Sequence, residues 1–68
     1  MREIEYIAPN GEHYLVSEIG EEFSMPFPGG ASGVARTIVG RRWVKSRQAF
    51  AKHPQPFTIR SWSRWTKA

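Results

Sequence analysis

The sequence predicts an α+β fold, in which an N-terminal hairpin and a C-terminal strand form a small antiparallel β-sheet with one helix packed on it. Three observations support this prediction. Polar and apolar residues alternate near the N-terminus just before a turn signal, and a long proline-free segment carries an apolar stripe at helical spacing. The C-terminal segment is rich in the Thr, Ile, Phe and Trp that favour strands. With 68 residues, the chain is expected to form a single small domain, residues 1–68.

The N-terminal hairpin is predicted from two strand patterns joined by Asn10-Gly11. Residues 3–7 alternate as a half-buried strand does, and residues 13–19 form the returning strand. Asn-Gly favours a two-residue turn, since both turn positions need a positive φ. Such a turn would place Ile7 opposite Tyr14.

The segment that follows the hairpin allows two interpretations. Residues 17–19 either end the returning strand or begin a short helix over residues 17–23 that is capped by Ser17, and Gly20 in its middle disfavours the helix. Residues 24–33 hold two prolines and three glycines, so they are predicted to be a loop that connects the two halves of one domain.

The packed helix is predicted between Gly30 and Lys52, a segment without proline. It should end near His53, because the following proline disfavours α geometry in the residue before it. Gly40 lies within this segment and would cost the helix about 1 kcal/mol relative to alanine. The apolar stripe of this helix consists of Ala35, Val39, Trp43 and Phe50.

The C-terminal strand is predicted over residues 57–66, where alternate side chains share a face. One face then carries Trp62 between Arg60 and Arg64. A helical reading of this tail also fits the periodicity, but its Thr, Ser, Trp and Phe residues are poor helix formers. Two of the three tryptophans are predicted to lie in the core, namely Trp43 and Trp65. Trp62 has two competing interpretations, an exposed stacking platform and a packed core residue.

The charges are segregated along the chain. Residues 1–35 hold one arginine and all six glutamates, a net charge of −5, whereas residues 36–68 hold nine basic residues and no acid, a net charge of +9. Carboxylates of the first half cannot neutralise all the cations of the second. This asymmetry indicates a polyanion as the partner of the basic half.

These features predict a non-enzymatic nucleic-acid-binding protein, of a regulatory or accessory kind, whose partner is DNA or RNA. Basic residues of the helix and of the last strand would contact phosphates, while the indole of Trp62 would stack on a base. A formal helix-turn-helix is disfavoured, because the connection before the basic segment is too long. The predicted binding residues are Arg36, Arg41, Arg42, Lys45, Arg47, Lys52, Arg60, Trp62, Arg64 and Lys67.

The alternative is a protein-interaction or inhibitor module that docks its basic half on an acidic surface of a larger partner. Phe27, flanked by prolines in a loop, could insert into a groove of that partner. An exposed patch of Phe27, Phe23 or Tyr6 would favour this alternative. An exposed Trp62 would favour nucleic acid.

Other functional classes have no support in the sequence. His13 and His53 are far apart and there is no cysteine, so neither a zinc site nor a disulfide is expected. No G-x-S-x-G elbow marks a nucleophile, and the glycine-rich segment lacks the G-K-[ST] ending of a phosphate-binding P-loop. We therefore expect no catalysis and no cofactor. With no secretory segment and no apolar run of about 18 residues, we expect a cytoplasmic protein without a membrane partner.

Overall fold

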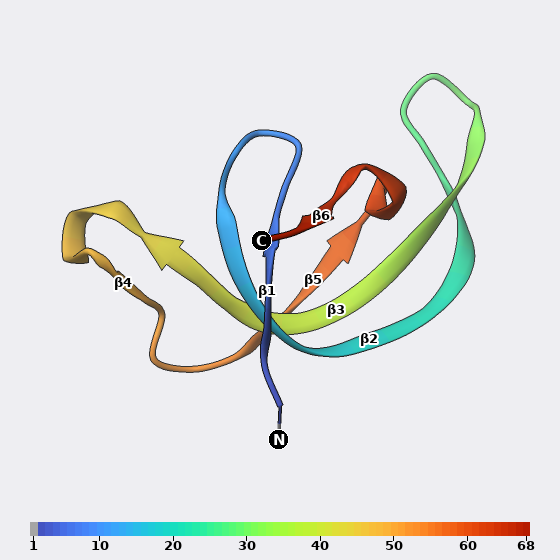
Figure 1. Ribbon diagram of the computed structural model, residues 1–68. Helices are drawn as coiled ribbons and strands as arrows, with labels where there is room; N and C mark the ends of the chain where they lie inside the picture. Colours follow the sequence, from blue (N-terminus) through green and yellow to red (C-terminus); the bar gives the residue numbers. More distant parts are fainter. Residues whose placement is uncertain (1) are drawn as a thin grey trace.

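The protein is a curled antiparallel β-sheet, a half-barrel, in the computed structural model, which describes residues 2–68 (Figure 1). The order in the sheet is β4-β3-β2-β1-β6, and β5 pairs with a different part of β3. The strands are β1 (Ile4–Ile7), β2 (His13–Pro26), β3 (Ser32–Val44), β4 (Ala49–Phe50), β5 (Gln55–Ile59) and β6 (Thr66–Lys67), and the two single-turn 3-10 helices are η1 (Lys45–Arg47) and η2 (Trp62–Arg64).

The long β2–β3 hairpin shapes the whole molecule. Its register shifts twice on the β2 side, between Val16 and Glu18 and again between Ile19 and Glu22. Such bulges bend a strand and increase its twist, which curls the sheet. The bent β3 then serves two further partners, β5 along residues 36–40 and β4 at its C-terminal end.

The predicted helix over 30–52 is wrong, and with it the α+β fold class. This segment forms β3, η1 and β4 instead, and no helix longer than a single turn occurs in residues 2–68. β-Branched residues lose side-chain freedom in a helix and pack well on a pleated sheet. The segment also lies between β2 and β5, both of which pair with its backbone. The β-branched residues of β3 are Val34, Thr37, Ile38, Val39 and Val44.

The predicted N-terminal hairpin is confirmed, but its register differs by one residue. Ile7 pairs with His13, because the turn holds three residues rather than two. Pro9 has a fixed negative φ that suits the second position of a type I turn. The N–H of Gly11 donates to the carbonyl of Ala8 at 2.8 Å, and Gly11 takes a positive φ of 88°. A type I turn followed by a left-handed glycine is the usual three-residue hairpin connection.

The predicted loop over 24–33 is shorter than expected, since β2 extends to Pro26 and β3 begins at Ser32. The alternative helix over residues 17–23 does not form, because this segment belongs to β2.

The predicted strand over 57–66 is correct only at its beginning. β5 ends at Ile59, the chain turns through η2, and β6 then pairs with β1. The carbonyl of Ser61 accepts the N–H of Arg64 at 2.9 Å, which closes this turn. The alternating face of Arg60, Trp62 and Arg64 therefore does not exist.

The core lies on the concave side of the half-barrel. Tyr14 packs against Trp65, with ring centroids 4.8 Å apart, and meets Phe57 edge-on at 5.3 Å. The prediction that Trp65 belongs to the core is confirmed, whereas Trp43 packs on Phe50, outside this cluster. The buried residues of the cluster are Ala8, Tyr14, Val16 and Ile38, and the partly buried ones are Tyr6, Phe57, Ile59, Trp62 and Trp65.

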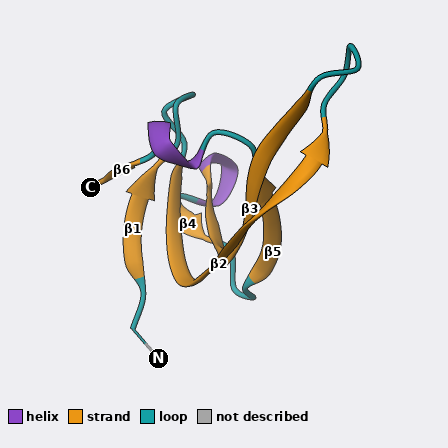
Figure 2. Ribbon diagram, turned by 90° about the vertical axis from the view of Figure 1, so that its right-hand side faces the viewer, coloured by secondary structure: helices purple, strands orange, loops and turns teal. Residues whose placement is uncertain are grey.

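The far end of the β2–β3 hairpin projects from the body as a two-stranded arm (Figure 2). We call residues 18–35 the arm. Along Glu18–Pro26, no strand of the described chain pairs with the outer edge of β2. Three large apolar side chains of the arm are exposed, namely Ile19 at 45%, Phe23 at 41% and Val34 at 53%.

Candidate nucleic-acid interface

Most of the predicted binding residues fall into two groups on the surface. One group surrounds η2 and the other follows the end of β3 into η1 and β4. The two 3-10 turns stand at the same end of the half-barrel, on opposite sides of the β1–β2 turn (Figures 1 and 2). The first group is Arg60, Trp62, Arg64 and Lys67, and the second is Arg42, Lys45, Arg47 and Lys52. These residues therefore do not share the helix face and strand face that the sequence predicts.

Two of the predicted binding residues are held in ion pairs. Arg41 makes a bidentate pair with Glu3, with Nε and Nη2 donating at 2.9 and 2.7 Å, and Arg41 also donates to the carbonyl of Ala51 at 3.2 Å. Arg36 pairs with Glu22 at 3.1 Å. In the described residues, the other eight basic side chains lack a carboxylate partner, whereas three of the six glutamates are not in an ion pair. A positive field therefore remains after pairing.

Glu3 gives the first testable prediction, a pH dependence of stability. Its hydrogen bond with the Arg41 guanidinium holds the pKa of the Glu3 carboxyl below its usual value near 4.5. A carboxyl group whose pKa is lower in the folded state than in the unfolded state stabilises the protein at pH values above its unfolded pKa. This contribution is lost as the pH falls through the folded pKa. Glu3→Gln should therefore lower the urea midpoint at about pH 6 and lower it less at about pH 3. An equal loss at both pH values would contradict this role of the ion pair.

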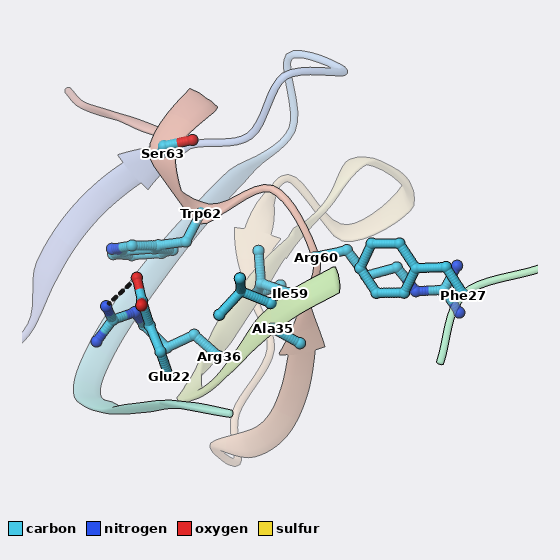
Figure 3. Close-up of a pocket in the computed structure, with 9 residues that line it drawn as sticks. Glu22, Phe27, Ala35, Arg36, Ile59, Arg60, Trp62 and Ser63 are labelled. Carbon is cyan, nitrogen blue, oxygen red and sulfur yellow. Dashed lines mark hydrogen bonds and ion pairs between the residues drawn. The ribbon is translucent and has the colours of Figure 1, made fainter. Parts of the chain in front are cut away.

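A pocket of about 320 Å³ lies between the base of the arm and η2 (Figure 3). Val34, Ala35 and Ile59 contribute its aliphatic surface. Arg36 and Trp62 approach it from one side, and Arg60 with Phe27 from the other. The complete lining is Glu22, Phe27, Val34, Ala35, Arg36, Ile59, Arg60, Trp62 and Ser63. Two aromatic rings and two guanidinium groups therefore meet at one concave site, drawn from three separate parts of the chain.

Trp62 combines the two roles that the sequence left open. Its ring packs on Tyr6 and Trp65, with centroids 4.9 and 5.4 Å apart, so it supports the core. The residue is nevertheless only half-buried, and it lines the pocket. This placement depends on η2, because the turn directs Trp62 out of the line of β5.

Arg60 and Phe27 form the opposite side of the pocket. The guanidinium carbon of Arg60 lies 5.1 Å from the centre of the Phe27 ring, a cation–π contact. Phe27 is fixed by its N–H, which donates to the carbonyl of Ala31 at 2.7 Å. Its ring lies directly on Gly33, where a Cβ would overlap it. From the sequence, Phe27 was assigned only to the protein-docking alternative. The sequence feature that could have indicated its packing is the glycine at position 33, which leaves room for the ring.

Arg36 has an unusual set of partners. Its Nη1 donates to the carbonyl of Gly20 at 2.7 Å, and its Nη2 donates to Oε1 of Glu22 at 3.1 Å. Its Nε is buried without a hydrogen-bond partner. The side chain of Glu22 is 64% exposed, against 24% for Arg36. The Glu22 carboxylate therefore covers the Arg36 guanidinium group from the solvent side. It accepts from Nη2 and not from Nε, although both donors lie on the same edge of the guanidinium group.

A second hollow lies on the other face of the sheet, lined by Glu5, His13, Trp43 and Phe50. Nδ1 of His13 and Oε2 of Glu5 are hydrogen-bonded at 2.5 Å. The rings of Trp43 and Phe50 meet edge-on at 5.1 Å. Within residues 2–68, no cluster of three His, Asp or Glu side chains is arranged to hold a metal ion. No helix in this part of the chain is long and apolar enough to cross a membrane.

Comparison with protein-family models, with curated proteins and with solved structures gave no match. The functional reading therefore depends on the geometry of the pocket and on the distribution of charge.

Proposed function

We propose that the protein binds nucleic acid without catalysing a reaction, as a regulatory or accessory factor. The observation that carries this proposal is the pocket in which Trp62 and Phe27 lie beside Arg36 and Arg60. Aromatic rings hold bases by their π faces, and guanidinium groups hold phosphates.

The surrounding charge supports the same proposal. Arg64 lies in η2 next to the pocket, and Lys67 pairs in register with Tyr6 on the neighbouring strand. Neither is ion-paired with a carboxylate of the described chain. Cations that are free of carboxylates release counterions when they meet phosphates, and this release drives binding to a polyanion.

The test is a fluorescence-anisotropy titration of labelled oligonucleotides at two salt concentrations. If three to four phosphates of a single strand are neutralised, affinity should fall roughly 20- to 50-fold between about 50 mM and about 200 mM salt. Replacing both Arg60 and Arg64 by glutamine should weaken binding and reduce this salt dependence. Arg2→Gln removes one positive charge outside the pocket and serves as the control. Absent binding at low salt, with unchanged tryptophan fluorescence, would contradict the proposal.

The alternative, a protein-interaction module, is favoured by a different observation. Phe23 is 41% exposed on the arm, together with Ile19 and Val34. Large exposed apolar side chains on one projecting element favour a protein-binding surface. In this second candidate function, the basic half would dock on an acidic surface of the partner while Phe23 inserts into it.

A further inference from the structure

We infer that the pocket takes one unpaired nucleotide of a single strand, and that the Glu22 carboxylate occupies the position of its phosphate on Arg36 until the strand binds. This inference deepens the proposed nucleic-acid binding and rests on it.

The selectivity for a single strand follows from the fold. A duplex is read most often by a helix or ribbon that enters its major groove. The basic segment after Gly30 forms β3 and η1, so residues 2–68 contain no helix that could do this. The one projecting ribbon in this part of the chain is the arm, which holds three glutamates and no basic residue, so its charge opposes entry into a groove. The ring of Trp62 is half-buried within the pocket lining rather than raised above the surface. A base can stack there only when it is released from its own pair and neighbours.

The phosphate position follows from the hydrogen bonds of Arg36. A guanidinium group binds a phosphate best through two parallel donors. Glu22 accepts from Nη2 alone, while the adjacent Nε has no partner. A phosphate in place of the carboxylate would accept from both Nε and Nη2. The hydrogen bond from Nη1 to the carbonyl of Gly20 would remain and keep the guanidinium group in place.

The exchange is favourable because Glu22 is loosely held. Its side chain is mostly exposed and makes a single hydrogen bond to Arg36. It can return to water without leaving a buried carboxylate unpaired. The phosphate that replaces it would have Trp62 and Arg60 in the same pocket, and the base of that nucleotide would stack on the indole.

Glu22→Gln tests the exchange directly. The variant keeps the shape of the side chain and removes the charge that competes with phosphate, so a single strand should bind about three- to fivefold more tightly. Glu21→Gln is the matched control, because it makes the same charge change one residue away and Glu21 does not line the pocket. It should change the affinity less than about twofold.

Arg36→Lys tests whether binding depends on the two parallel donors of the guanidinium group, Nε and Nη2. Lysine keeps the positive charge but offers no planar pair of donors, so binding should weaken about tenfold. Circular dichroism and a urea titration of each variant establish that the fold is retained.

The experiment uses the full chain with labelled oligo(dT) and oligo(rU) of about 12 nucleotides, and with a hairpin duplex of the same length. A clear preference for single strands, tightened by Glu22→Gln and not by Glu21→Gln, is the expected result. Equal effects of the two glutamine variants would overturn the role of Glu22. A duplex that binds as tightly as the single strands would overturn the selectivity while leaving nucleic-acid binding intact. No binding to any of these probes would overturn the proposed function itself.

Discussion

Ile38→Ala should remove much of the stability of the protein. Ile38 is the one side chain in the described chain that is large and fully buried, with 0% of its surface exposed. It lies on β3 between β2 and β5, opposite Ile19 on one side and Phe57 on the other. Truncation of a buried isoleucine costs about 2–5 kcal/mol, because transfer energy and packing are both lost.

This loss is large relative to the total free energy of unfolding of the protein. A domain of 68 residues has a free energy of unfolding of roughly 3–10 kcal/mol. Urea unfolding followed by tryptophan fluorescence measures the difference, and Ile38→Val is the control with an expected cost of about 0.5–1.5 kcal/mol. A loss below about 1 kcal/mol for the alanine variant would contradict the central position of Ile38.

Gly40→Ala should destabilise the protein by about 2–3 kcal/mol, through overpacking rather than through a cavity. A Cβ at this position would lie 2.5 Å from the carbonyl oxygen of Leu15 and 3.1 Å from the Cα of Val16. Both of these atoms belong to the backbone of the paired strand, so they cannot rotate away. The two long strands would have to separate where the first bulge begins.

The control for this substitution is Gly29→Ala at the tip of the arm. A Cβ there meets no atom within 4 Å, although the positive φ of 90° carries a strain cost of about 1–2 kcal/mol. The two variants are compared by their urea midpoints. If Gly40→Ala proved as stable as the parent protein, the close approach of β2 and β3 at this point would be wrong.

The sequence predicted those parts of the fold that local patterns determine. Strand alternation and the turn residues identified the N-terminal hairpin, and Thr, Ile and Phe identified the start of the last strand. The turn register was wrong, because Pro9 selects a type I turn and so overrides the preference of Asn-Gly for two positive φ values.

The helix prediction failed for a reason of tertiary structure. Apolar residues of β3 do not alternate cleanly with polar ones, because they face two different surroundings. Bulges in β2 also shift the pairing between β2 and β3. Ala35 and Ile38 are both buried although they are three residues apart, a spacing that also fits a helix. The β-branched residues of this segment were the better signal. Gly40, interpreted as a cost to a helix, is the point where two strands touch.

The candidate site was predictable only in part. Trp62 and Arg60 were identified from the tail, where they are close in sequence. Phe27 and Glu22 come from the arm, and no local pattern shows that they meet the tail. The separation of charge along the chain was visible, but the folded chain joins Arg41 to Glu3 and Arg36 to Glu22 across it. Long-range pairing of this kind depends on register, which a single sequence does not reveal.

The bare outer edge of β2 has a consequence for how the protein behaves at high concentration. Unpaired N–H and C=O groups along a strand are a template for growth of the sheet by further chains, and exposed Ile19 and Phe23 would strengthen such stacking. Glu18 and Glu21 lie along the same edge, and their charges would repel an identical edge that approached antiparallel. These two glutamates therefore act as gatekeepers that oppose aggregation along this edge.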